Sequence, residues 1–220
     1  MKIDKETLNT LKNFSDINMS VEVKAGNVLR TVSVQKNILA QAEVETTFPQ
    51  DFAIYEVNRF LGAASLFDDP EFTFGEKSVK IGNNKYSLDY VYCDPHMIVT
   101  PPENNITVPD PEVRFTLTQE NLSQVLKAGN VLGTPEISVE STGSEMVMKA
   151  MDVNNDSSDT FTVNLDGTSD TKFRFVFKIE NFKMVSGEYD VEISSKGIAR
   201  FSRNKLQYWI ATESSSNYGG

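Results

Sequence analysis

The chain has 220 residues, of which 39% are hydrophobic and 24% are charged. Because that apolar share suffices for a folded core, the composition excludes a globally disordered chain and favours one large domain or two small ones. The formal net charge of −10 argues against a protein that grips nucleic acid with its whole surface, since such proteins carry basic patches that neutralise phosphates. A local basic face on an otherwise acidic protein remains compatible with this net charge.

The amino-terminal residues and the single cysteine bear on the compartment. Charged residues begin at Lys2, so we expect no signal peptide, and the apolar runs are far shorter than the roughly 20 residues of a membrane span. One cysteine, Cys93, forms no internal disulfide and supports no cysteine-based zinc site. We therefore expect a soluble protein of a reducing cytoplasm.

The first half of the chain predicts two helices and six strands. Asp4 can cap a helix over residues 4–14, with Leu8, Leu11 and Phe14 as its apolar stripe, and a second helix fits Tyr55–Phe67. Gly26 is expected to form a tight turn between the first two strands. The predicted strands are Ser20–Lys24, Val28–Val34, Ile38–Glu45, Glu71–Phe74, Ser78–Ile81 and Lys85–Tyr92.

Five prolines fall between Asp94 and Pro111, a density that blocks helix and central strand alike. We interpret residues 95–111 as an extended connector between a domain over 1–94 and a second domain over 112–213. The Ser/Gly-rich residues 214–220 are expected to form a flexible tail.

The second half predicts a helix over Gln119–Asn130, capped by Thr118, and a short helical turn over Ile179–Val185. The predicted strands are Glu136–Glu140, Met146–Ala150, Thr160–Leu165, Lys172–Lys178, Glu188–Ser194, Ile198–Ser202 and Leu206–Thr212. The order of helix, strands, helix, strands thus occurs twice, each time over about 110 residues. Two copies of one α+β fold are the simplest explanation.

No candidate catalytic site stands out. We interpret His96 as an exposed loop histidine beside an unreactive thiol, Cys93. The sequence has no Walker loop and no Gly-x-Gly-x-x-Gly motif. Asp152–Asp156 opens like a calcium loop, but Ser157 and Val163 stand where that loop needs glycine and glutamate, so a hairpin turn is favoured. We therefore expect a protein that is not an enzyme and needs no cofactor or metal.

Basic residues recur on the predicted helices. Lys5 and Lys12 share one side of the first helix, and Arg59 lies opposite the apolar stripe of the second. Lys127 lies off the apolar face of the third helix, and Lys183 belongs to the fourth helical segment. Two interpretations stay open: solvated helix faces, which glutamates on the same elements favour, or a surface that presents cations to a phosphate backbone.

With this order of elements and the segments given below, the chain resembles the DNA sliding clamps, and most closely those of T-even-type bacteriophages. These clamps are the processivity subunits of the phage DNA polymerases. The resemblance extends from Met1 to about Glu213. The sequence departs from the family pattern at Arg59, where the family can carry a small residue. It implies the DNA-clamp fold, with two similar helix-plus-antiparallel-sheet domains per chain in a ring-forming homotrimer. The segments that carry it are Leu11-Lys12-Asn13-Phe14, Phe52-Ala53-Ile54-Tyr55, Asn58 with Phe60-Leu61-Gly62, Asp94-Pro95, Leu122 with Leu126, and Lys183-Met184 with Gly187 and Tyr189.

The resemblance also implies a mode of action. Helices would line a hole wide enough for duplex DNA, and Lys5, Lys12, Arg59, Lys127 and Lys183 would face the DNA through loose, sequence-independent contacts that permit sliding. An ATP-dependent clamp loader would open the ring, which would tether the replicative polymerase and serve as a platform for late-transcription factors. The site of action would be the cytoplasm of an infected bacterial host cell.

Two further surfaces follow from the resemblance. The polymerase of such a family docks a carboxyl-terminal peptide into an apolar pocket beside the connector, here expected at Ile106, Val108 and Pro109 with Trp209 beneath. Alternatively, Ile106 and Val108 only pin the connector to the sheet. Ring closure needs unpaired strand edges, and Lys85–Tyr92 and Thr160–Leu165 are the candidates for the subunit joint.

The second interpretation of the whole chain is a duplicated β-rich structural protein of a phage virion. A clamp would form a ring and stimulate a polymerase on primed circular DNA only with a loader. A virion protein would instead co-purify with particles.

Overall fold

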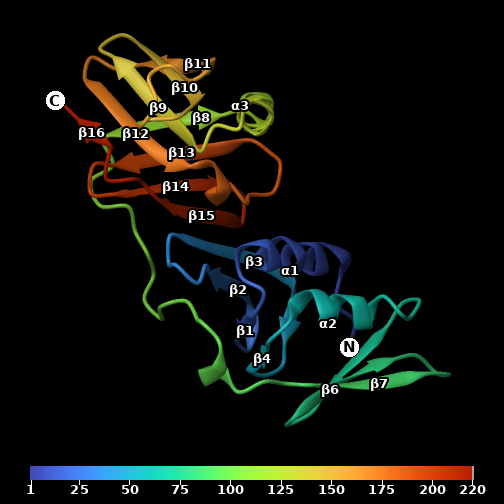
Figure 1. Ribbon diagram of the computed structural model, residues 1–220. Helices are drawn as coiled ribbons and strands as arrows, with labels where there is room; N and C mark the ends of the chain where they lie inside the picture. The colour runs from blue at the N-terminus through green and yellow to red at the C-terminus, as the bar shows by residue number, and fades with distance from the viewer. Residues whose placement is uncertain (220) are drawn as a thin grey trace. The chain divides into compact units, whose positions relative to one another are not determined.

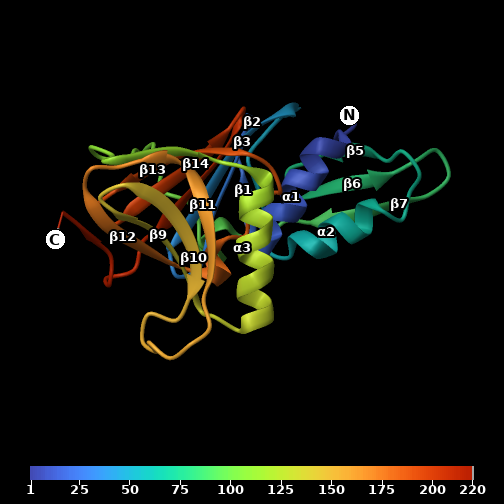
Figure 2. The same ribbon diagram turned by 90° about the horizontal axis from the view of Figure 1, so that it is seen from above.

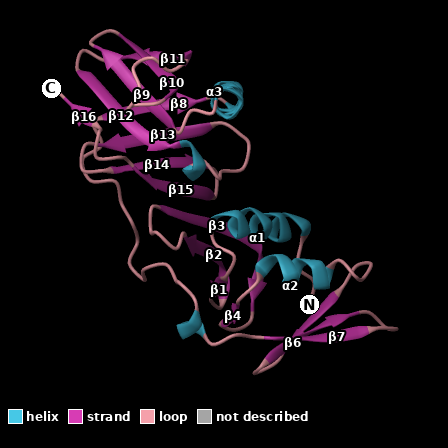
Figure 3. Cartoon of the chain, in the orientation of Figure 1, coloured by secondary structure: helices cyan, strands magenta, loops and turns pink. Residues whose placement is uncertain are grey.

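The computed structural model describes residues 1–219, and the chain divides into two compact units, Met1–Asn104 and Asn105–Gly220. Each unit places helices against antiparallel strands, as Figures 1 and 3 show. Among residues 1–219, no helix has both the length and the apolar character needed to span a membrane. The domain boundaries at 94, 111 and 213 stay predictions.

Unit 1 begins with a helix and contains three separate groups of paired strands. Its elements are α1 (Lys5–Ile17), β1 (Val21–Val23), β2 (Gly26–Val32), β3 (Ile38–Phe48), β4 (Phe52–Ile54), α2 (Val57–Ala64), β5 (Glu71–Phe74), β6 (Ser78–Gly82), β7 (Ser87–Val91) and the 3-10 helix η1 (Pro95–Met97). Strand β1 pairs with β4, β2 pairs with β3, and β5, β6 and β7 form a three-stranded antiparallel sheet.

Helix α1 confirms the predicted start and its cap. The carboxylate of Asp4 accepts a hydrogen bond from the Thr7 amide at 2.8 Å, which satisfies one of the donors left over at a helix start. The helix continues to Ile17, and Leu11, Phe14 and Ile17 are buried. Helix α1 lies beside α2 in Figures 1 and 2, and the two pack on the strands of unit 1.

Two predictions for unit 1 need correction, and one strand was missed. Gly26 does not form a tight turn but begins β2, where its φ of +116° accommodates a register shift against β3. Strand β4 was not predicted, because its three residues are all buried and show no alternation. Helix α2 ends at Ala64 and is shorter than the predicted Tyr55–Phe67.

Unit 2 has one long helix and two groups of paired strands. Its elements are β8 (Val113–Leu117), α3 (Gln119–Leu132), β9 (Glu136–Thr142), β10 (Glu145–Met151), β11 (Phe161–Thr168), β12 (Lys172–Lys178), the 3-10 helix η2 (Ile179–Asn181), β13 (Tyr189–Ser194), β14 (Ile198–Arg203), β15 (Leu206–Ala211) and β16 (Asn217–Tyr218). One sheet has the order β11-β10-β9-β12-β16, and β8, β13, β14 and β15 pair in the order β8-β13-β14-β15. Strand β8 was not predicted.

Helix α3 confirms the helix expected after Thr118. The Thr118 hydroxyl accepts a hydrogen bond from the Asn121 amide at 3.2 Å, and Gly133 ends the helix with a φ of +69°. Figure 2 shows α3 standing beside β10 and β11, on which it packs. The helical turn expected over Ile179–Val185 is only the 3-10 helix η2, so unit 2 lacks a counterpart of α2 among its described residues.

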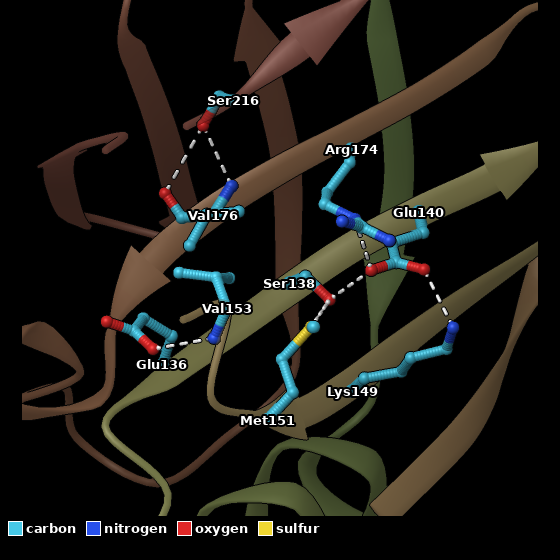
Figure 4. Close-up of polar contacts among 9 residues, drawn as sticks. All are labelled: Glu136, Ser138, Glu140, Lys149, Met151, Val153, Arg174, Val176 and Ser216. Atoms are coloured by element: carbon cyan, nitrogen blue, oxygen red, sulfur yellow. Dashed lines mark hydrogen bonds and ion pairs between the residues drawn. The ribbon is translucent and has the colours of Figure 1, made fainter. Parts of the chain in front are cut away.

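The flexible tail predicted for 214–220 is wrong for the residues that the structure describes. Asn217 and Tyr218 form β16, which pairs with β12. The Ser216 hydroxyl accepts a hydrogen bond from the Val176 amide at 2.9 Å (Figure 4). The Tyr218 ring stacks on Phe173 with centroids 6.2 Å apart, so an aromatic anchor holds a segment whose composition alone suggests disorder.

Candidate nucleic-acid interface and partner-binding surfaces

The predicted DNA-facing lysines of unit 1 lie on the exposed face of α1. Lys5 and Lys12 are both exposed, on the side of the helix away from buried Leu11 and Phe14. The Lys12 ammonium donates a hydrogen bond to the Asn58 side-chain oxygen on α2 at 2.8 Å. Lys12 is thereby held beside the start of α2, whereas Lys5 points to solvent.

Arg59 lies on α2 and is exposed, as predicted, but its surroundings differ from those of the lysines. Its guanidinium Nη1 is 3.9 Å from Glu56 Oε2, a weak exposed ion pair. Its side chain also borders a cavity of about 550 Å³ between α2 and β7, together with Tyr55, Tyr90 and Tyr92. Arg59 therefore faces the edge strand of the β5-β6-β7 sheet.

In unit 2 the predicted cations come from α3 and from the loop after η2. Lys127 is exposed on α3 and borders a cavity of about 530 Å³, with Asn130 on the same helix and Met184 from the loop. Lys183 is exposed in that loop. The Val185 amide donates to the Tyr208 hydroxyl at 3.2 Å, so the loop is anchored to β15.

The helix faces that carry these cations are mixed in charge. Glu6 and Asp16 are exposed on α1, and Glu120 is exposed on α3. Each face therefore offers separate cations rather than a continuous basic patch. Separate exposed charges suit weak, salt-sensitive contacts with a phosphate backbone better than a tight complex.

The residues assigned to the predicted partner pocket differ in how far they are buried. Ile106, Val108 and Pro109 are half-buried in an irregular segment, and Trp209 in β15 is 6% exposed. The Pro109 carbonyl accepts a hydrogen bond from the Ser194 hydroxyl at 2.6 Å. The segment is therefore fixed at one end to the end of β13, which agrees with the alternative that Ile106 and Val108 pin the connector.

Sequence reasoning missed Arg30, which binds the middle of the connector. Its Nη1 donates to the Pro102 carbonyl at 2.8 Å, and its Nη2 donates to the Asn104 carbonyl at 3.3 Å. Burial lowers the pKa of the Arg30 guanidinium. The available signal was an arginine inside the alternating apolar pattern of a strand, because such a residue needs acceptors nearby.

Strands β7 and β11, the candidates for the subunit joint, each lie at the edge of their sheet. An edge strand presents unpaired amide and carbonyl groups to which another strand can add. Among residues 1–219, no three His, Cys, Asp or Glu side chains are arranged to hold a metal ion.

The fold is that of the DNA clamps. It resembles an A. fulgidus PCNA, solved with the C-terminal region of FEN-1, at a TM-score of 0.69 and 12% identity over 96% of each chain. It also resembles the beta chain of DNA polymerase III from Streptococcus pneumoniae, at a TM-score of 0.67 and 13% identity. That likeness covers 94% of this chain but 63% of the bacterial one, so the chain spans less than two thirds of the beta chain's length.

Sequence similarity to protein families and phage proteins identifies the family more specifically than the fold does. Residues 2–98 match the DNA polymerase processivity factor family, and residues 114–214 match the gp45 sliding clamp, C terminal family. The chain is 36% identical to the sliding clamp of Vibrio phage KVP40, over 97% of this chain and 99% of that protein. It is 30% identical to the sliding clamp of Enterobacteria phage T4, over 99% of each. The chain belongs to the sliding-clamp family of phage DNA polymerase processivity factors.

These findings confirm the predicted resemblance to the T-even-type phage clamps and the predicted fold class. The alternative of a duplicated virion protein is not supported, because both halves match clamp families.

Proposed function

We propose that the protein encircles duplex DNA as a homotrimeric ring and tethers the replicative polymerase of its phage. The observation that carries this proposal is the match along nearly the whole chain to a phage sliding clamp. Retention on DNA then comes from topology rather than affinity. The mixed charge of the exposed helix faces supports this, because strong binding would oppose sliding.

The five cations form the proposed DNA-facing surface. Lys5, Lys12, Arg59, Lys127 and Lys183 lie on helices or in the loop that replaces a helix, and all are exposed. Repeated around a ring, separate cations would give the hole a positive potential inside a protein whose net charge is −10. The contacts would be with phosphates, and therefore independent of base sequence.

The proposed partner site takes a short carboxyl-terminal peptide of the polymerase. An archaeal PCNA of the same fold is known in complex with the C-terminal region of FEN-1, which supports peptide docking in such proteins. In this chain the proposed site is Ile106, Val108 and Pro109 with Trp209, where half-buried apolar side chains flank an irregular segment.

Further parts of the proposal concern the setting. The protein would not be an enzyme, and an ATP-dependent loader would open the ring. It would act in the cytoplasm of the infected bacterial cell, and late-transcription factors would use the same ring. The two domains would be residues 1–94 and 112–213, joined by the connector 95–111.

The decisive experiment measures polymerase products on primed circular DNA. With the cognate polymerase, loader and ATP, the protein should lengthen the products of single binding events, and it should fail to do so when the loader is omitted. Linearising the template should shorten its residence, since a ring slides off an open end. Equal retention on linear and circular DNA would contradict topological binding.

A further inference from the structure

Residues 182–188 connect η2 to β13 as an irregular segment, which we call the Lys183 loop. Among the described residues, unit 2 has this loop where unit 1 has the helix α2. A helix satisfies most of its backbone amide and carbonyl groups internally, whereas a loop that packs on a sheet must find partners elsewhere. The backbone of the Lys183 loop is therefore fixed by other parts of unit 2.

Two buried tyrosines bind the backbone of this loop at a single residue. The Tyr208 hydroxyl of β15 accepts a hydrogen bond from the Val185 amide at 3.2 Å, and the Tyr189 hydroxyl of β13 donates one to the Val185 carbonyl. Both side chains are completely buried, and their rings meet edge to face with centroids 6.0 Å apart. Burial raises the pKa of Tyr189 to about 12 and also raises the pKa of Tyr208, so both hydroxyls stay protonated at neutral pH.

A third side chain, Arg203 of β14, binds the loop one residue further on. Its Nη1 donates to the Ser186 carbonyl at 2.7 Å, and its guanidinium carbon lies 5.7 Å from the centre of the Tyr189 ring. A β-carbon on Gly187 would lie 1.6 Å from this Nη1, so a larger residue there would displace the guanidinium. Figure 1 shows β13, β14 and β15 side by side, and each of these strands provides one of the three side chains that hold the loop.

The Lys183 loop and α3 share a cavity of about 530 Å³. Met184 and Ser186 line it from the loop, and Lys127 and Asn130 line it from α3. Lys183 is exposed next to Met184. The position of the loop therefore determines the distance between two of the predicted DNA-facing cations, Lys127 and Lys183.

We propose that Tyr189 and Tyr208 are positioning residues for DNA, which hold the Lys183 loop so that Lys183 and Lys127 meet the phosphate backbone together. The inference rests on the proposed DNA-facing surface and adds to it two residues that touch no DNA themselves. A mobile loop would lose backbone entropy each time Lys183 met a phosphate, whereas a fixed loop loses only side-chain freedom. Fixing the loop thus lowers the cost of contacts that form and break as the ring slides.

The first test examines the loop itself and needs no DNA. Tyr208→Phe keeps the ring but removes the acceptor of the Val185 amide, so hydrogen exchange in the Lys183 loop should become about tenfold faster. The matched control is Tyr218→Phe, which removes a tyrosine hydroxyl from β16 and should leave exchange in the loop unchanged. Hydrogen exchange followed by mass spectrometry provides the measurement. Unchanged exchange in Tyr208→Phe would overturn the proposal.

The second test asks whether Tyr208 acts through Lys183. With polymerase, loader and ATP on primed circular DNA, Lys183→Gln should reduce the amount of loaded protein about threefold, and Tyr208→Phe about twofold. In the double variant the tyrosine change should add nothing, because a loop without its cation gains nothing from being held. In a Lys183→Arg background, which keeps the charge, Tyr208→Phe should again reduce loading about twofold. An equal effect of Tyr208→Phe with and without the cation would show a merely structural role and overturn the proposal.

A second variant keeps the proposal testable if loss of the Tyr208 hydroxyl prevents folding. Gly187→Ala should displace the Arg203 guanidinium from the Ser186 carbonyl and leave both tyrosines in place. It should speed hydrogen exchange in the Lys183 loop and reduce loading about twofold, and the second effect should vanish in a Lys183→Gln background. Faster exchange with undiminished loading would count against the proposal.

The outcomes separate this inference from the proposed function. A ring that loads normally and ignores Lys183→Gln would overturn the positioning role and leave the ring standing. A native protein that never loads on circular DNA with its polymerase and loader would overturn both.

Discussion

At the start of α1, the carboxylate of Asp4 accepts hydrogen bonds from the Thr7 amide, the Thr7 hydroxyl and the Thr46 hydroxyl. Burial by itself would raise the pKa of Asp4, but the hydrogen bonds from Thr46 and Thr7 prevail and lower it to about 2. The ionised side chain thus links the helix start to β3. A single residue here determines where a helix begins and how it is tied to its sheet.

We expect Asp4→Ala to reduce the free energy of unfolding by about 1 kcal/mol, because the cap is lost. In the native chain the folded pKa lies below the ordinary value of 3.8. The stabilisation is therefore present above about pH 4 and is lost as the pH falls towards 2. Asp4→Asn keeps a capping oxygen without the charge, so its stability should vary less over that range. Urea unfolding between pH 2 and 5 would measure both effects, and an identical pH dependence in all variants would contradict the assignment.

Glu140 in β9 is the centre of a charged group on the sheet of unit 2 (Figure 4). Its carboxylate lies 2.7 Å from Lys149 Nζ and 2.9 Å from Arg174 Nε, and it accepts a hydrogen bond from Ser138 at 2.8 Å. Burial would raise the pKa of Glu140, but the hydrogen bonds from Lys149 and Ser138 lower it. The buried carboxylate is thus kept ionised between two cations on neighbouring strands.

We expect Glu140→Gln to cost about 2 kcal/mol of folding free energy, because two cations lose their shared partner. The matched control is Glu145→Gln, which removes an exposed carboxylate from the adjacent strand and should change little. Urea unfolding of the two variants at neutral pH provides the comparison. Equal effects of the two substitutions would show that the ion pairs contribute nothing specific.

At the scale of elements, the connector is less free than its prolines suggest. Arg30 binds carbonyl groups of residues 102–104, and the Asn18 side chain donates to the Val99 carbonyl at 3.3 Å. At the other end, Ser194 and Lys196 bind Pro109 and Asp110. Side chains of both units thus hold the segment that the proposed partner site requires.

Removing Arg30 should loosen the connector around residues 102–104. We expect Arg30→Ala to raise the rate of cleavage after Glu103 by a glutamate-specific protease about fivefold, because the backbone loses its charged donors. Lys36→Ala serves as the control on an exposed cation elsewhere in unit 1. An unchanged cleavage rate would mean that the prolines alone restrain the segment.

The two interpretations of Ile106 and Val108 lead to different results. If they form the partner site, Ile106→Asp with Val108→Asp should abolish stimulation of the polymerase, because buried carboxylates would oppose an apolar peptide, while the assembly stays intact. If they only pin the connector, the double variant should lower the unfolding midpoint and leave stimulation in place. Polymerase assays and thermal unfolding of the same preparation would decide between them.

At the scale of the whole molecule, an acidic protein is proposed to enclose an acidic polymer. This is physically reasonable only if cations from many helices converge while carboxylates dominate elsewhere. The single chain shows separate exposed cations on mixed helix faces. A positive hole would therefore arise from assembly.

Neutralising Lys12 and Lys127 tests that idea. Lys12→Gln keeps a donor for Asn58, so the contact between α1 and α2 survives while the charge is lost. Combined with Lys127→Gln, it should weaken loading on circular DNA several-fold and reduce the salt dependence, while sedimentation shows an unchanged assembly. Lys36→Gln is the control. Unaltered DNA association on linear and circular templates would remove these lysines from the proposed DNA-facing surface.

The sequence alone predicted the helices over residues 4–14 and Gln119–Asn130 and most strands, because capping residues and alternation are local signals. The structure extends these helices to Ile17 and Leu132. The resemblance to a known family supplied the clamp fold, which no local pattern contains. Prediction failed where tertiary contacts outweigh local preference, as at β4, whose three residues are all buried, and at β16, where Tyr218 packs on Phe173.

The candidate sites divide along the same line. The exposure of Lys5, Lys12, Arg59 and Lys127 followed from helical periodicity, which is a property of neighbouring residues, whereas Lys183 is exposed in a loop where a helical turn was expected. The cavity beside Arg59 and the role of Arg30 depend on residues far apart in the chain, which only folding brings together. Local spacing determines which side of a helix a residue occupies, whereas the tertiary structure determines which other residues that side contacts.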